Sequence, residues 1–127
     1  MKNFIMNENV FVMAKEPAPD LTIKEAEKAL SKIKNEKELA MLFAIAENKA
    51  WWIEDEIYDY KEGTEEYRLA VEKTDLWFLL ADRLRYKIFA ILIKEGVQIP
   101  IIGQKAILEP FMNRNGYKDN QGWWVNI

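Results

Sequence analysis

Apolar residues recur at spacings of three and four through two long stretches of this 127-residue chain, and a short glycine-containing break separates them. The first stretch covers residues 36–60, the second covers 64–95, and Lys61-Glu62-Gly63 stands between them. This spacing places apolar side chains on one face of an α-helix. A short break allows the second helix to fold back against the first. The sequence therefore predicts a pair of long antiparallel helices.

Helix start signals precede three segments. Thr22 and Glu25 have the spacing of a capping box ahead of a short amphipathic run, which predicts a first helix over 22–33. Asn35 and Thr64 precede the two long helices, and both residue types accept hydrogen bonds from the free N–H groups of a first turn. The three signals agree with the apolar periodicity that follows each of them.

The two ends of the chain lack this regularity. Residues 1–19 contain two prolines and predict an extended arm with a short strand over 10–13. Residues 97–127 predict a small irregular appendage, with a helical pattern over 104–112 and turn signals around a hairpin at 117–125. The whole chain is thus predicted to be one all-α domain, a helical bundle with an N-terminal arm and a C-terminal turn or hairpin.

The composition excludes most side-chain catalytic devices. The chain has no histidine, no cysteine and a single serine, Ser31. A serine, cysteine or histidine triad and a zinc site with nitrogen and sulfur ligands therefore cannot form. An enzyme built from this sequence would depend on Asp or Glu with a hard cation such as Mg²⁺. We therefore favour a non-enzymatic protein.

No apolar run approaches the roughly 18 residues that cross a bilayer, and the first residues do not have the pattern of a signal peptide. We expect a cytoplasmic protein that does not enter a membrane, which the absence of cysteine also fits. The frequent Lys, Glu, Asn and Ile residues are compatible with an AT-rich genome and so with a bacterial, phage or mobile-element origin.

An acidic and aromatic segment is the leading candidate for a functional surface. Residues 47–66 carry eight acids and two bases, a net charge of −6. On a helix over this segment, several of the acids and aromatic residues point away from the apolar stripe. Exposed aromatic residues anchor protein interfaces, and carboxylates around them steer a basic partner. The predicted partner-binding residues are Trp51, Glu54, Asp55, Tyr58, Glu62 and Glu66.

Two alternatives concern the same helices. Trp51 and Tyr58 are equally well explained as aromatic residues covered by the N-terminal arm or the C-terminal tail. Residues 76–80 are apolar on every side of their helix, so a homo-oligomer through the 76–93 helix is a second possibility.

Basic residues and tryptophans follow in the last third of the chain, an arrangement compatible with a winged DNA-binding unit. Their low density and an isoelectric point near 5.1 argue against a nucleic-acid partner. The bases in question are Arg83, Arg85, Lys87, Lys94, Lys105, Arg114 and Lys118. Trp123 and Trp124 are better explained as a plug for the end of the bundle.

Four acids form a second candidate site. Glu56 and Asp59 lie three residues apart on one predicted helix, and Glu72 and Asp75 lie three apart on the next. Such pairs face one side of each helix, and converging carboxylates bind a divalent cation. An enzyme of this kind would use Mg²⁺ to hold a triphosphate and to activate water.

At these positions the chain resembles the all-alpha nucleoside triphosphate pyrophosphohydrolases of the MazG type. The resemblance covers residues 47–84, and the segment EKTDLWFLLADRL looks like the second half of the family pattern. It implies Mg²⁺ coordination by Glu56, Asp59, Glu72 and Asp75 and oligomerisation through the helices. The chain departs from the family at Asp59, where the family prefers Glu. A magnesium-dependent pyrophosphohydrolase is therefore the alternative function.

Overall fold

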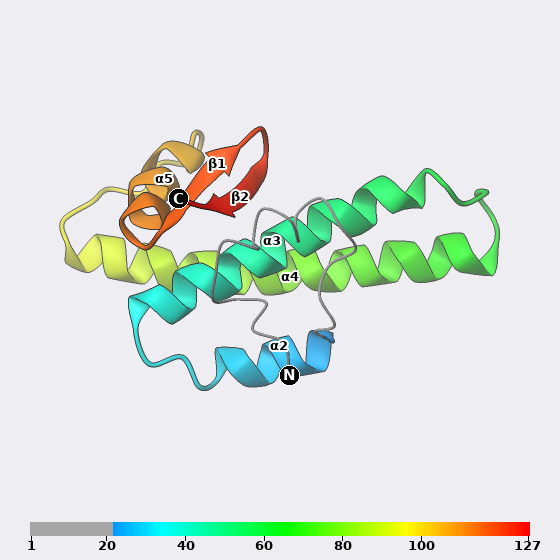
Figure 1. Cartoon of the computed structure of the whole chain (residues 1–127), viewed down its shortest axis with the longest axis horizontal. Helices are drawn as coiled ribbons and strands as arrows, with labels where there is room; N and C mark the ends of the chain where they lie inside the picture. The colour runs from blue at the N-terminus through cyan, green and yellow to red at the C-terminus, as the bar shows by residue number, and fades with distance from the viewer. Residues whose placement is uncertain (1–21) are drawn as a thin grey trace.

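The computed structural model describes residues 22–127, so the predicted arm and its strand lie outside the described residues. Its framework is the predicted long antiparallel pair of helices (Figure 1). The short first helix lies along one side of this pair, and a fourth helix with a two-stranded antiparallel hairpin lies along the other. The elements are α2 (Ile23–Leu30), α3 (Glu36–Ile57), α4 (Glu65–Lys94), α5 (Lys105–Arg114), β1 (Tyr117–Asn120) and β2 (Trp123–Asn126). The predicted all-α bundle with a C-terminal hairpin is confirmed.

The predicted start signals are the caps of the helices. The Thr22 hydroxyl accepts a hydrogen bond from the Glu25 N–H at 3.1 Å, and the Glu25 carboxylate accepts one from the Thr22 N–H at 2.9 Å. The side chains of Asn35 and Thr64 each accept a hydrogen bond from the backbone N–H three residues later. Each cap satisfies a donor that the first turn of a helix leaves free.

Two helices end three residues earlier than predicted. Helix α2 ends at Leu30 rather than at 33, because the Ser31 hydroxyl donates to the Lys28 carbonyl at 2.7 Å and the chain turns there. Helix α3 ends at Ile57 rather than at 60. Tyr60 therefore leaves the apolar stripe of that helix and is exposed. Local turn hydrogen bonds at both ends replace helical ones.

The C-terminal segment is more regular than predicted. Helix α5 continues through its internal proline, and the hairpin turns at Gln121 and Gly122, whose φ angles are 54° and 99°. Positive φ at two successive residues is the geometry of a tight hairpin turn, which favours glycine. No helix within residues 22–127 combines the length and the apolarity needed to cross a bilayer.

Trp124 attaches the hairpin to α3. Its side chain is fully buried and packs against Phe43, with 6.3 Å between the ring centroids. The buried Asn48 amide satisfies both backbone groups of Trp124, donating to its carbonyl at 2.8 Å and accepting from its N–H at 2.9 Å. An amide side chain thus takes the place of a neighbouring strand. This contact fixes the hairpin over the middle of α3 rather than at an end of the bundle.

Candidate functional site

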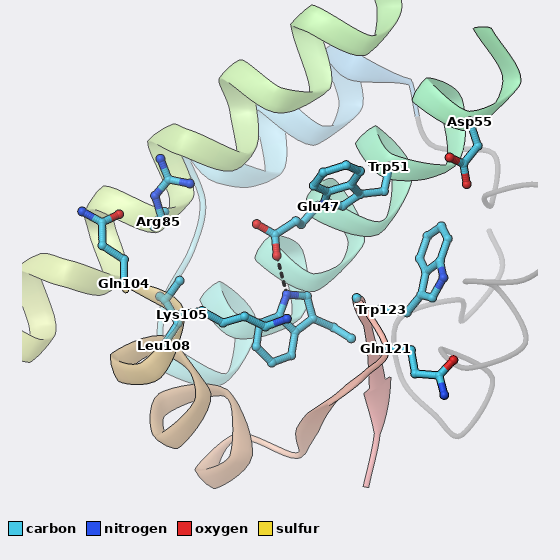
Figure 2. Close-up of a pocket in the computed structure, with 11 residues that line it drawn as sticks. Glu47, Trp51, Asp55, Arg85, Gln104, Lys105, Leu108, Gln121 and Trp123 are labelled. Atoms are coloured by element: carbon cyan, nitrogen blue, oxygen red, sulfur yellow. Dashed lines mark hydrogen bonds between the residues drawn. The ribbon is translucent and has the colours of Figure 1, made fainter. Parts of the chain in front are cut away.

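A cleft of about 470 Å³ lies beside α3, where the hairpin and the start of α5 approach it (Figure 2). Helix α3 contributes Glu47, Trp51 and Asp55, which are spaced four residues apart and so share one face. The other lining residues come from α4, the start of α5 and the hairpin: Arg85, Gln104, Lys105, Leu108, Gln121, Gly122, Trp123 and Trp124. The cleft therefore combines residues that are up to 77 positions apart.

The two ends of the cleft differ in chemistry. In Figure 2, Trp51, Asp55 and Trp123 lie toward one end, and Arg85 and Lys105 lie toward the other. The first end is acidic and aromatic, whereas the second is basic. We call the first the acidic–aromatic end and define it by Trp51, Asp55 and Trp123.

Glu47 lies between these ends and is held by Trp124. The indole N–H of Trp124 donates to the Glu47 carboxylate at 2.5 Å. Burial raises the pKa of Glu47, while the Trp124 hydrogen bond and the nearby charges of Arg85 and Lys105 act in the opposite direction. Glu47 thus balances the basic end of the cleft, and its carboxylate is already engaged within the protein.

Trp51 is presented in a fixed position. Its ring packs edge-on against Phe78 of α4, with a centroid distance of 5.3 Å and an interplanar angle of 88°. The side chain is nevertheless 44% exposed. On the hairpin side, Trp123 packs against Trp52 at 6.2 Å. Aromatic neighbours therefore orient both tryptophans at this end of the cleft.

The structure divides the six predicted partner-binding residues. Trp51 and Asp55 line the cleft, and Tyr58, one helical turn further along, is 83% exposed. Glu54 is half-buried on α3, Glu62 lies exposed in the connection between the long helices, and Glu66 lies exposed in the first turn of α4. The acids among these six residues form no ion pair within residues 22–127; they are Glu54, Asp55, Glu62 and Glu66.

The four acids of the alternative site are not gathered into a metal centre. Glu72 instead forms an ion pair with Arg68 on its own helix. Within residues 22–127, no group of three or more acidic side chains is placed so that it could hold a metal ion. The magnesium-dependent activity stays a prediction of the resemblance, which a direct assay of pyrophosphate release tests.

Several lining residues were not predicted. Glu47 had a usable signal, because it lies one helical turn before Trp51 on the same face. Arg85, Lys105 and Trp123 reach the cleft only through tertiary packing, and no local pattern marks them. Four of the seven bases considered for nucleic-acid binding are engaged in ion pairs with carboxylates of the protein: Arg83, Arg85, Lys105 and Arg114.

Comparisons with known proteins add no relative to this picture. No family model, no curated protein and no solved structure matches the sequence.

Proposed function

We propose that this protein is a non-enzymatic interaction protein that binds a basic segment of a partner macromolecule at the acidic–aromatic end of the cleft. The observation that carries the proposal is the position of Trp51 and Asp55, one turn apart on α3 and both on the cleft. An indole face attracts a nearby cation, and a carboxylate beside it pairs with the same cation. This combination fits a lysine or arginine side chain of the partner.

The fixed position of Trp51 supports this proposal. A side chain already held by Phe78 loses little conformational freedom when a partner binds. Tryptophan is also among the residues that contribute most to the binding energy of protein interfaces. Tyr58, the residue that caps the end of α3, is exposed beyond the cleft. Trp51 is thus the anchor of the proposed interface, and Tyr58 lies at its rim.

The charge around the anchor supports a basic partner. The segment 47–66 has a net charge of −6, and its exposed acids include Asp55, Glu62 and Glu66. Acids on one side of a surface accelerate the approach of a basic partner, and salt weakens this effect. The partner class proposed here is therefore a protein with a basic segment, such as a nucleic-acid-binding protein.

The proposal is tested by selecting peptides from a displayed random library on the immobilised protein. We expect the selected peptides to be rich in Arg or Lys and their binding to weaken as salt is raised. The double variant Trp51→Ala with Tyr58→Ala should lose this binding and should also abolish capture of a cellular partner. Its circular dichroism spectrum should remain helical, because both side chains are exposed.

The matched control is Ile101→Ala with Ile102→Ala. These two residues are 94% and 87% exposed and lie in the segment that joins α4 to α5, outside the cleft lining. The control should bind the selected peptides as the parent does. Selection of acidic peptides, or unchanged binding by the Trp51→Ala, Tyr58→Ala variant, would contradict the proposal.

A further inference from the structure

The outer face of α4 carries a second apolar surface that the proposed function does not use. Five large apolar side chains on this helix are between 47% and 64% exposed: Leu69, Leu76, Leu79, Tyr86 and Ile93. They extend over 25 consecutive residues, or about 36 Å of helix. We call this surface, together with the exposed Glu72, Arg83 and Ala90 among them, the outer stripe.

The outer stripe follows the repeat of a coiled coil. Its members alternate at spacings of three and four through the helix, at positions 69, 72, 76, 79, 83, 86, 90 and 93. The buried residues of α4, among them Trp77, Leu84 and Ile88, occupy the opposite face and pack toward α3. A seven-residue repeat on one face is the pattern by which two helices pack knobs into holes.

The two charged members of the outer stripe determine the direction of such packing. Glu72 and Arg83 have opposite charges and lie at equal distances from the midpoint between Leu76 and Leu79. In a parallel pair of identical helices, Glu72 would face Glu72 and Arg83 would face Arg83. In an antiparallel pair centred on that midpoint, each Glu72 faces an Arg83. Only the second arrangement places opposite charges together.

We propose that two copies of this chain associate through their outer stripes, with the two α4 helices antiparallel and related by a two-fold axis between Leu76 and Leu79. This register also places four of the five large apolar members opposite one another, with Leu69 facing Tyr86 and Leu76 facing Leu79, while Ile93 lies beyond the paired segment. A two-fold contact is self-complementary, as such an interface requires. The occupant of the stripe is thus a second copy of the same protein.

Glu72 and Arg83 are available for this contact. Glu72 pairs with Arg68, and Arg83 lies 3.4 Å from Glu27 of α2. Their side chains nevertheless remain 59% and 52% exposed. Each can therefore accept a further partner across the interface. Charged residues within an apolar contact between two helices select one register, at some cost in the affinity of the helices for each other.

Charge reversal tests the proposal by sedimentation of the parent and of three variants. The parent should form dimers at concentrations up to roughly 100 µM, the range of a weak specific association. Glu72→Arg and Arg83→Glu each place like charges opposite one another and should weaken dimerisation by about tenfold or more. The double variant restores opposite charges across the interface and should dimerise more strongly than either single variant, although it loses the pairs with Arg68 and Glu27 within each chain. A monomeric parent, or a double variant weaker than both single variants, would overturn the proposal.

Cross-linking tests the direction, and the absence of native cysteine makes it site-specific. Leu69→Cys protein is mixed with isotope-labelled Tyr86→Cys protein and treated with a short bis-maleimide. The proposed register predicts links between the two variants, because positions 69 and 86 face each other. It also separates the two copies of position 69 by about 25 Å. Predominant links from 69 to 69 would show a parallel pair and overturn the proposal.

This inference is independent of the proposed function. The Trp51→Ala, Tyr58→Ala variant should dimerise normally, because neither residue belongs to the outer stripe. The Glu72→Arg variant, in turn, should still bind basic peptides at the acidic–aromatic end. Loss of one property without the other therefore identifies which of the two proposals has failed.

Discussion

The two halves of the α3–α4 pair differ in how much of their surface is buried. The proximal half, residues 36–50 and 78–94, lies between α2 on one side and α5 with the hairpin on the other (Figure 1). The distal half, residues 51–77, extends beyond α2 and α5, and the hairpin reaches its first turn, where Trp123 packs against Trp52. Twelve proximal apolar residues of α3 and α4 are at most 4% exposed, whereas the distal half buries chiefly Ile53, Ala70 and Trp77. Its large side chains Tyr58 and Leu69 remain exposed.

This difference follows from the number of packing layers. A pair of helices alone buries only the face that each helix turns toward the other. In the proximal half, the hairpin and α2 cover further faces, so residues such as Phe43 and Ile88 become inaccessible. Beyond the contact of Trp52 with the hairpin, the distal half depends on the first contact alone. We therefore expect the proximal half to determine most of the stability. The acidic–aromatic end of the cleft includes distal residues, and the outer stripe runs along both halves.

The largest predicted effect tests the proximal half. Trp124→Ala should lower the free energy of unfolding by about 3–5 kcal/mol, because it removes a fully buried ring and leaves a cavity against Phe43. Tyr58→Ala in the distal half should change it by less than about 0.5 kcal/mol, because that ring is exposed. Urea unfolding measures both values. Similar losses of unfolding free energy for the two variants would show that the proximal half does not determine the stability.

A smaller effect on the free energy of unfolding distinguishes two buried polar residues, Asn48 and Thr74. Asn48→Ala should cost about 2–3 kcal/mol, because both backbone groups of Trp124 then lose their partner in a buried site. Thr74 is the distal counterpart, and its hydroxyl donates to the Ala70 carbonyl of its own helix at 2.8 Å. Thr74→Val should cost less than about 1 kcal/mol, because the helix hydrogen bonds remain.

Thermal unfolding, followed by the far-ultraviolet circular dichroism signal, measures the stability of the Asn48→Ala and Thr74→Val variants. The Asn48→Ala protein should also show increased hydrogen exchange in the hairpin, since the contact joins β2 to α3. An Asn48→Ala variant as stable as Thr74→Val would show that the hairpin is held mainly by the Trp124 ring.

Local signals predicted the helices well because they depend on neighbouring residues. Thr22, Asn35 and Thr64 mark the helix starts through side chains that bond three residues ahead. The predicted ends were less accurate, since the turns at Ser31 and Tyr58 compete with one more helical turn. Periodicity cannot resolve that competition.

The candidate site was predicted only in part, for a related reason. Trp51 and Asp55 are recognisable because they share one face of a helix. Trp123 reaches the same cleft because Asn48 holds the hairpin across α3, and Lys105 of α5 lies beside the hairpin through its ion pair with Asp119. A contact between residues 76 positions apart has no signature in the local pattern. The four acids show the converse. Glu72 and Asp75 lie on α4 as predicted, but Asp59 lies in the turn after α3, and the two pairs are not gathered into a group that could hold a metal ion.

The smallest predicted effect concerns ion pairs in the two halves. At the proximal end, Arg114 donates to both Glu36 and Glu95 and so connects α5 with the ends of α3 and α4. In the distal half, Arg68 pairs only with Glu65 and Glu72 of its own helix. Arg114→Met should therefore cost up to about 1 kcal/mol near neutral pH, and Arg68→Met less, because these groups are exposed and screened.

The stability difference between the parent and Arg114→Met should depend on pH, because it depends on the pKa of Glu36. Its hydrogen bonds from Arg114 hold the pKa of Glu36 below its ordinary value of 4.5 in the folded state. A carboxylate with a depressed folded pKa contributes stability above its unfolded pKa and loses that contribution as the pH falls through the folded value. The stability difference between the parent and Arg114→Met should therefore shrink as the pH falls from roughly 5 to 3. Urea unfolding at each pH measures it, and a difference that grows on acidification would show that Arg114 stabilises the fold by packing rather than through Glu36.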